Sequence, residues 1–532
     1  MRRTIMRFLP VLIVVLGLTR PALCADRPAH APFDTEASLR PTTTIDRVVF
    51  SKIRQLHLQP ANLCSDAVFV RRVFLDVIGT LPTLEETRGF LMDRDPNKRR
   101  KLVDQLLERD EFADYWAMKW CDLLRVKAEF PINLWPNAVQ AYHRWIKTSI
   151  KTNMRYDQFV HELLCSSGSN FRVPQVNFYR STQSRKPEDI ALAVALTFMG
   201  ARADKWPAER LRGMARLFAY IGYKRTSEWK EEVVFFDAQK LAADVKKDGP
   251  QTATLPDDTV VTLTPDKDPR EQFADWLIAP RNPWFARCIG NRVWFWLLGR
   301  GVVQPPDDFR ADNPPSNTRL LNILATDVRA ARYDLRQVFR RVLTSKTYQL
   351  SSVWKGDFKT GEACFACYPI RRLDAEVLID AICQITGTNE EYSSAIPEPF
   401  TFIPSGQRTV ALADGSITSP FLDMFGRPPR DTGQALERNN RPSAAQRLHF
   451  LNSSHIREKI ERGSKMRALL SSKGGPRETA TRLYLTILSR LPTRQELQTI
   501  AQYAKSDGID ARTAMIDLAW ALFNSVEFQN RH

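Results

Sequence analysis

Common catalytic signatures are missing from this chain of 532 residues. It has no serine-centred nucleophile elbow, no H-E-x-x-H pair and no glycine-rich phosphate loop. Standard hydrolase, zinc-protease and nucleotide chemistries therefore lack support. Histidine is also scarce, and His143, His161, His449 and His455 are scattered, with no pair at a helical ligand spacing. We predict no metal site and no bound cofactor.

Cysteine is too sparse to form a disulfide framework. Of eight cysteines, seven remain if residues 1–25 are removed, and this number is odd. Cys364 and Cys367 are the one close pair. A zinc site would need a second pair, and a haem-attachment site would need a histidine directly after Cys367. We predict a local disulfide between Cys364 and Cys367, with a redox dithiol as the alternative.

Long hydrophobic runs are absent apart from a short one near the N-terminus. Phe8–Leu18 spans eleven residues, too few to cross a bilayer of about 30 Å as a helix. The run follows three arginines and precedes the small residues Ala22–Ala25, a pattern typical of a secretory signal peptide. We expect residues 1–25 to be removed, leaving an exported, periplasmic or extracellular protein without a membrane span. A lipoprotein signal through Cys24 and a membrane anchor are the alternatives.

Acidic residues are outnumbered by basic ones. The chain has a net charge of +17, and residues 1–25 contain four arginines and no acid, so the remaining chain carries +13. The surplus is spread along the sequence, and Lys98–Lys101 is the longest basic run. An exported basic protein can bind acidic polysaccharide, anionic lipid or nucleic acid, or simply present a solvated basic face. We expect an acidic polysaccharide or a periplasmic protein as partner, and no nucleic acid.

Apolar residues at helical spacing run along most of the sequence. Strand patterns are confined to Glu232–Phe236 and Thr259–Leu263, which flank a linker and can pair as a small hairpin. We predict a mainly α protein with two helical domains built from helix-turn-helix units. The predicted divisions are a signal peptide (1–25), a polar spacer (26–45), an N-terminal helical domain (46–231), a linker with a short hairpin (232–266) and a C-terminal helical domain (267–532).

Two phrases of the sequence recur in the same order. Arg72–Glu86 parallels Arg482–Glu496, and downstream Asp104–Phe112 parallels Trp520–Phe528. A further fragment of the second phrase occurs at Phe339–Tyr348. Chance is an alternative for fragments this short, but the retained order favours a duplicated helix-turn-helix unit.

Two carboxylates follow an arginine- and tryptophan-rich helix predicted over about Trp284–Leu298. Asp307 and Asp308 lie in a proline-stiffened loop, where two acids can serve as an acid/base pair or as cation ligands. The alternative is structural, because Asp–Arg pairs pin loops to helices and tryptophans fill cores. The catalytic candidates here are Asp307, Asp308 and Arg292, and the binding candidates are Trp294, Trp296 and Arg310.

A second charged cluster contains Arg371, Arg372, Asp374, Glu376 and Asp380. Glu376 and Asp380 are four residues apart, so they share a helix face, where like charges repel unless a cation lies between them. Arg372 is one turn before Glu376 and is the expected neutraliser. Glu376 is a further catalytic candidate, with structural use as the alternative.

Several motifs together resemble a two-domain family of unknown function that is abundant in planctomycetes and called cytochrome-associated. The N-terminal half resembles domain of unknown function 1549, and the C-terminal half resembles domain of unknown function 1553. The motifs that carry this resemblance are Arg71–Thr83, Phe112–Trp116, Trp120, Asp268–Arg270, Asn291–Trp294, Gly299–Gly301, Asp307–Arg310, Asn313–Ser316, Arg371–Glu376 and Phe425–Pro428. Within the last motif, Arg427 is a further binding candidate.

The resemblance implies an exported protein whose relatives often carry a cytochrome c domain or are encoded near cytochromes and sulfatase-like proteins. Many relatives have a Cys-x-x-Cys-His-x-His-Pro segment just before the residues that match Trp206. Here Met199–Trp206 runs through without that cluster. The resemblance therefore does not extend to haem or metal binding by this chain.

Three functions follow as hypotheses. The leading one is a binding or scaffold component of a periplasmic or extracellular polysaccharide-processing or redox system. The second is a carbohydrate-active enzyme that uses the Asp307/Asp308 region. The third is a cytochrome-associated protein that has lost its haem motif. Acids that converge on a tryptophan-lined cleft would favour the enzyme, and buried Asp–Arg pairs would favour the scaffold.

Overall fold

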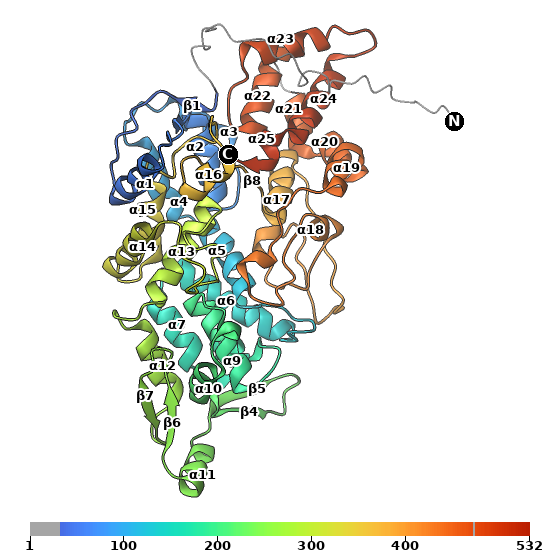
Figure 1. Cartoon of the computed structure of the whole chain (residues 1–532). Helices are drawn as coiled ribbons and strands as arrows, with labels where there is room; N and C mark the ends of the chain where they lie inside the picture. Colours follow the sequence, from blue (N-terminus) through green and yellow to red (C-terminus); the bar gives the residue numbers. More distant parts are fainter. Residues whose placement is uncertain (1–31, 472–473) are drawn as a thin grey trace. The chain divides into compact units, whose positions relative to one another are not determined.

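Helices dominate the computed structural model, which describes residues 32–471 and 474–532 (Figure 1). The mainly α prediction is confirmed. The predicted signal peptide (1–25) and part of the predicted spacer (26–31) lie outside the described residues. The helices of the first half are α1 (Thr44–Gln55), α2 (Asp66–Val77), α3 (Leu84–Met92), α4 (Lys98–Leu107), α5 (Asp110–Leu123), α6 (Pro136–Lys151), α7 (Tyr156–Cys165), α8 (Asn177–Arg180), α9 (Pro187–Val194) and α10 (Ala208–Ala215).

The second half continues in the same way. Within the described residues, no helix is long and apolar enough to cross a membrane. The helices are α11 (Ala238–Asp248), α12 (Pro269–Ile278), α13 (Phe285–Leu298), α14 (Thr318–Ala330), α15 (Leu335–Leu343), α16 (Phe358–Cys364), α17 (Ala375–Thr386), α18 (Pro420–Met424), α19 (Ala444–Asn452), α20 (Ser454–Arg462), α21 (Ser464–Leu470), α22 (Pro476–Leu488), α23 (Arg494–Tyr503), α24 (Ala511–Asn524) and α25 (Val526–Gln529).

The strands are short and form small antiparallel sheets. The three-stranded sheet has the order β3-β5-β4, and β1 pairs with β2, β6 with β7, and β8 with β9. The strands are β1 (Asp34–Thr35), β2 (Leu63–Cys64), β3 (Gly168–Ser169), β4 (Ile221–Arg225), β5 (Glu232–Phe236), β6 (Gln251–Thr254), β7 (Val260–Leu263), β8 (Arg371–Arg372) and β9 (Asn530–Arg531).

A small hairpin does form near the predicted domain junction, but its strands are not the predicted pair. β5 pairs with β4 and β3, whereas β7 pairs with β6. The β4–β5 and β6–β7 pairs each cross a short turn, which costs less loop-closure entropy than a connection that contains α11. Figure 1 shows α11 beyond the β6–β7 hairpin, in the green part of the chain.

The duplicated helix-turn-helix unit is visible in the turns. Thr83 caps α3 and forms a capping box with Glu86, and Thr493 caps α23 and forms the same box with Glu496. The residues that end the preceding helices also match: Gly79 has a φ of 60° and Ser489 a φ of 58°. The two units contact each other, since α3 packs against α22.

Both units also contain the same Glu–Arg–Glu bridge. Arg109 lies 2.6 Å from Glu86 and 2.5 Å from Glu111. Arg490 lies 2.8 Å from Glu496 and 2.7 Å from Glu527. The glutamates occupy equivalent places in the two phrases, but the arginines do not. Each copy therefore has its own Glu–Arg–Glu bridge, and the arginine of the bridge comes from a different position in each copy.

The mid-chain fragment shares the geometry of the second phrase. The Ser345 hydroxyl accepts a hydrogen bond from the Tyr348 backbone N–H (3.2 Å) and donates to the Val342 carbonyl (2.6 Å). The Ser525 hydroxyl accepts from Phe528 (3.1 Å) and donates to Leu522 (2.7 Å). These matching turns favour a repeated unit over chance similarity.

Two buried arginines on α2 bind residues from the far end of the chain. Arg71 donates to the carbonyls of Ile487 (2.7 Å) and Phe528 (2.9 Å). Arg72 donates to the carbonyls of Tyr348 (2.6 Å) and His532 (2.8 Å). Residues Pro32–His532 accordingly form one compact unit, and the division into two domains at 232–266 stays a prediction.

Candidate functional site

Asp307 is held in a buried ion pair. Its Oδ1 lies 2.6 Å from the Nη2 and 3.1 Å from the Nε of Arg292, which is fully buried on α13. Arg292 also donates to the carbonyls of Leu196 (2.7 Å) and Thr197, and Asp307 Oδ2 accepts from the Ala435 backbone N–H (2.7 Å). The pair therefore pins the loop to α13 and to two further segments.

Asp308 has a different partner from its neighbour. Its carboxylate binds Arg310 at 2.6 Å and 2.9 Å, and Arg310 also lies 3.2 Å from Asp312. The Arg310 side chain remains 32% exposed. Each of the two candidate catalytic acids is thus neutralised by its own arginine, Asp307 inside the protein and Asp308 near the surface.

Of the candidate binding tryptophans, Trp294 lies in the core and Trp296 is half-buried against it. Trp294 is fully buried, and its ring meets Phe365 edge-on at 5.1 Å. Trp296 packs against Trp116 at 5.1 Å and Trp120 at 5.8 Å. A sugar ring needs an open aromatic face, which Trp294 does not offer and which Trp296 shares with two other rings.

Glu376 is buried against arginines, but not against the expected one. It binds Arg438 in a bidentate pair at 2.6 Å and 3.0 Å, and it lies 3.6 Å from Arg427. Arg372, the predicted neutraliser, instead donates to Gln529 (3.0 Å), so that prediction is wrong. The partners come from a segment about 60 residues away that helical spacing alone cannot reveal.

Asp380, four residues after Glu376, is held by backbone groups. It accepts hydrogen bonds from the N–H groups of Thr409 (2.7 Å) and Val410 (3.1 Å). Burial raises the pKa of the Asp380 carboxyl, whereas the two N–H groups and Arg408 oppose that shift. The two acids that share one helix face are thus satisfied separately.

Asp374 and Asp76 lie at the centre of a larger buried charge network. Asp374 binds Lys119 (2.8 Å) and Arg531 (3.0 Å), and Arg531 lies 3.2 Å from Asp76. Asp76 also accepts hydrogen bonds from two tyrosine hydroxyls, each at 2.8 Å, those of Tyr348 and Tyr368. The network joins α2, α5, α17 and β9.

The pKa values of Asp374 and Lys119 are both lowered, but for different reasons. Burial acts to raise the pKa of Asp374, but Lys119, Arg531 and Arg438 hold it well below its usual value. Burial lowers the pKa of Lys119 to about 8, although Asp374 opposes this shift. An ionised, fully paired carboxylate is a poor proton donor, so we read the network as structural.

Sequence patterns missed most of this network. Lys119, Arg438 and Arg531 lie in none of the motifs, and Asp76 lies within the motif Arg71–Thr83, which does not indicate a buried charge network. The available signal was a charged residue inside an otherwise apolar helical run, as at Asp76 within Val73–Ile78 and at Lys119 beside Trp120. Such isolated charges are buried only when paired.

The histidines are not all scattered. His449 on α19 and His455 on α20 bring their ring nitrogens within 3.3 Å of each other, and His455 lies 2.9 Å from Glu390. Lys459 also approaches Glu390, at 3.1 Å. In the described part of the chain, no group of three or more His, Cys, Asp and Glu side chains could hold a metal ion.

Cys364 and Cys367 are both buried and are free thiols in this structure. Burial raises the pKa of Cys367 to about 12, so this thiol is not a ready nucleophile at neutral pH. The disulfide between the two cysteines stays a prediction.

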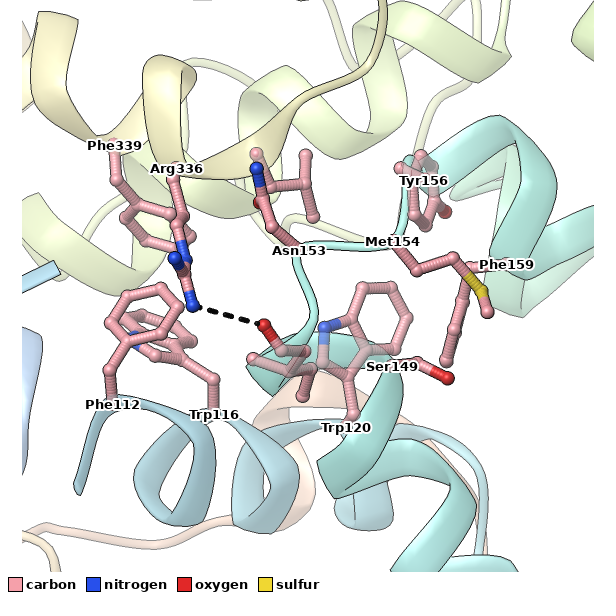
Figure 2. Close-up of a pocket in the computed structure, with 12 residues that line it drawn as sticks. Phe112, Trp116, Trp120, Ser149, Asn153, Met154, Tyr156, Phe159, Arg336 and Phe339 are labelled. Atoms are coloured by element: carbon pink, nitrogen blue, oxygen red, sulfur yellow. Dashed lines mark hydrogen bonds between the residues drawn. The ribbon is translucent and has the colours of Figure 1, made fainter. Parts of the chain in front are cut away.

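An aromatic cavity of about 40 Å³ lies between α5, α6, α7 and α15. Figure 2 shows Trp116, Trp120 and Phe159 on its wall, with Arg336 hydrogen-bonded to the Ile150 carbonyl at 3.5 Å. The cavity has room for a few water molecules at most. It is too small for a sugar or a haem. A second hollow of about 330 Å³ between α3 and α4 is lined by both apolar and charged side chains.

Other aromatic side chains lie open at the surface, and sequence patterns did not indicate them. Trp229 is 70% exposed and Phe400 is 51% exposed. Phe400 packs against Trp135 at 5.4 Å, and the Lys230 ammonium lies over both tryptophans, 5.3 Å from the Trp135 ring and 5.6 Å from the Trp229 ring. Exposed apolar groups that gather in a patch mark interaction sites.

Comparison with known proteins identifies two regions. Residues 44–204 match PSCyt2, a protein of unknown function (DUF1549), and residues 269–504 match PSD1, a protein of unknown function (DUF1553). No curated protein and no solved structure matches the chain. The two matches occur in the order that the motifs predicted, which confirms the resemblance. The chain therefore belongs to the family of proteins of unknown function in which a DUF1549 region is followed by a DUF1553 region.

Proposed function

We propose that this protein is an exported binding or scaffold protein that engages an acidic polysaccharide. The single observation that carries this proposal is that the candidate catalytic acids are neutralised by arginines. Asp307 is bound by Arg292, and Glu376 is bound by Arg438.

Glycoside hydrolysis requires a pair of carboxyl groups that flank a bound sugar, one of them protonated. The arginine and lysine partners favour the ionised form of Glu376 and Asp374 and lower the pKa of both groups, against the effect of burial. Trp294 is buried in the core beside Arg292 rather than exposed to a ligand. These features support a protein that binds without cleaving.

The positive charge supports an anionic ligand. A net charge of +13 without residues 1–25 attracts polymers with repeated carboxylate or sulfate groups, which release counterions on binding. Export is part of the proposal, because a secreted or periplasmic protein meets such polymers outside the cytoplasm. N-terminal sequencing of protein produced from the full gene would reveal whether residues 1–25 are removed.

A thermal-shift screen of protein lacking residues 1–25 tests the proposal. Sulfated, carboxylated and neutral glycans are compared at low and at moderate salt. We expect a carboxylated or sulfated glycan to raise the melting temperature selectively, and part of the shift to survive moderate salt. A shift with every polyanion that vanishes with salt would reduce the interaction to net charge. No shift with any glycan would contradict the proposal.

A further inference from the structure

We infer that acidic polysaccharide binds at the surface formed by Trp135, Trp229, Lys230 and Phe400, which we call the aromatic platform. This inference rests on the proposed function and names the part of the surface that would perform it. Its rings replace Trp294, which lies in the core, and Trp296, which packs against the core, as the stacking residues.

Three separate segments build the aromatic platform. Trp135 precedes α6, Trp229 and Lys230 lie in the turn between β4 and β5, and Phe400 lies between α17 and α18. The Ala395 backbone N–H donates to the Glu129 carboxylate at 3.1 Å, which ties the third segment to the first. Segments distant in sequence therefore present their rings on one surface.

The rings are exposed although burial would stabilise them. Burial of an aromatic side chain stabilises a fold, yet Trp229 is 70% exposed and Phe400 is 51% exposed. Phe130 and Phe402, on the same segments as Trp135 and Phe400, are 84% and 70% exposed. Apolar groups gathered in this way point to a ligand that covers them.

The backbone at the platform is also strained. Trp135 has a φ of 74° and a ψ of 146°, a combination that normally only glycine adopts. Lys230 has a φ of 62°. Non-glycine residues in such backbone conformations are strained, and they cluster at functional sites. Here the strained positions are the ones that carry the tryptophan and the lysine of the platform.

The chemistry of the platform matches a sugar that carries negative charge. An aromatic face has partial negative charge, which attracts both the Lys230 ammonium and the partly positive C–H groups of a pyranose ring. A carboxylate or sulfate on that sugar would then meet Lys230. Lys224 and Arg225 are exposed on β4, directly before the turn, and add positive charge. Glu231 in the same turn already accepts hydrogen bonds from Ser169 and Thr226.

Matched variants test the aromatic platform by isothermal titration with an oligogalacturonate, a sulfated dextran oligomer and a neutral maltooligosaccharide. Phe400→Ala and Trp229→Ala remove platform rings. Phe358→Ala is the control, because Phe358 is 50% exposed and touches one tryptophan, Trp354. Lys230→Gln is compared with Lys247→Gln, whose side chain is 80% exposed on α11.

We expect Trp229→Ala to weaken binding of the acidic oligomer about tenfold at moderate salt, and Phe400→Ala to act in the same direction. Lys230→Gln should weaken the binding of acidic oligomers. The dissociation constants of both control variants should stay within twofold of the wild-type value. All variants should keep the wild-type melting temperature within a few degrees, because the altered aromatic side chains and Lys247 are exposed and the half-buried Lys230 is replaced by a polar side chain of similar length.

The possible failures are distinguishable. If the wild type binds the acidic oligomers and Trp229→Ala and Phe400→Ala bind them equally well, the aromatic platform is overturned while the proposed function stands. If Lys230→Gln and Lys247→Gln weaken binding equally, Lys230 has no special role. The inferred contact between Lys230 and the charged group of the sugar is then overturned. If the wild type binds none of the oligomers, both the proposed function and the platform are overturned.

Discussion

At the scale of single residues, the sequence identified the right chemical groups in the central loop but not their surroundings. Their order along the chain singles out Asp307, Asp308, Arg292 and Arg310, and it is also compatible with ion pairs that pin the loop. The partner of Glu376 could not be predicted, because Arg438 reaches it through tertiary folding. The spacing favours Arg372 because spacing along one helix indicates only the neighbours on that helix.

The adjacent acids Asp307 and Asp308 allow a direct comparison of a buried with a more exposed ion pair. Asp307→Asn should lower the free energy of unfolding by about 3–5 kcal/mol, since Arg292 would keep a buried charge without a partner. Asp308→Asn should cost about 1 kcal/mol or less, because Arg310 is partly exposed and retains Asp312. Urea denaturation measures both values, and equal losses would contradict the assignment of Asp307 to the core.

His143 should make the stability depend on pH. Burial lowers its pKa to about 3 from 6.5, so the unfolded chain takes up a proton below pH 6.5 and the folded chain does not. Stability is therefore fully present above pH 6.5 and falls as the pH drops toward 3, by about 2 kcal/mol at pH 5. Melting temperatures between pH 7.5 and 5 measure the slope.

The control for this titration is His57→Asn, which alters an exposed histidine and suits its positive φ of 55°. We expect His57→Asn to keep the wild-type slope and His143→Leu to flatten it. Part of the slope should remain in His143→Leu, because burial also lowers the pKa of His532 to about 3. An unchanged slope in His143→Leu would refute this role.

At the scale of elements, helices were predictable and strand pairing was not. Apolar residues at helical spacing and the T-x-x-E boxes placed α2, α3, α22 and α23, since both signals are local. The strands β4 and β6 are short and mostly polar, so no alternation marked them as partners for β5 and β7. The best-supported long-range prediction was the repeat, which relied on comparing the sequence with itself.

The two Glu–Arg–Glu bridges should differ in strength because they differ in burial. Arg490 is 7% exposed, whereas Arg109 is 33% exposed. Arg490→Ala should destabilise the protein by about 3 kcal/mol, and Arg109→Ala by about 1 kcal/mol, because solvent screens the more exposed bridge. Chemical denaturation of the two variants provides the comparison. A larger loss for Arg109→Ala would contradict burial as the source of the difference between the two bridges.

At the scale of the whole molecule, the two family regions depend on each other. Trp116 of the first region packs against Trp296 and Phe339 of the second at 5.1 Å and 4.3 Å. Asp76 receives both of its arginines, Arg371 and Arg531, and both tyrosine hydroxyls from residues after position 340. A sequence can mark each region by its motifs, but it does not reveal that their cores are shared.

A fragment of residues 32–231 should therefore fail to fold alone. Its buried Arg71, Arg72 and Asp76 would lose their partners, which leaves uncompensated polar groups inside the core. We expect no near-ultraviolet circular dichroism and no cooperative melting for this fragment, whereas residues 32–532 should unfold in one transition. The complementary fragment, residues 232–532, added in equimolar amount, is the control for rescue. Independent cooperative folding of residues 32–231 would instead support two separate domains.

The hydrogen bond from Arg72 to the His532 carbonyl also determines when the core around α2 can be completed during synthesis. The two residues are separated by 460 positions, and a ribosome adds about 5–20 residues per second. The α2 helix thus waits roughly half a minute to a minute and a half for the residue that closes its core. During synthesis the first half carries unmatched arginines and open apolar surface, so a chaperone has a long interval in which to bind it unfolded.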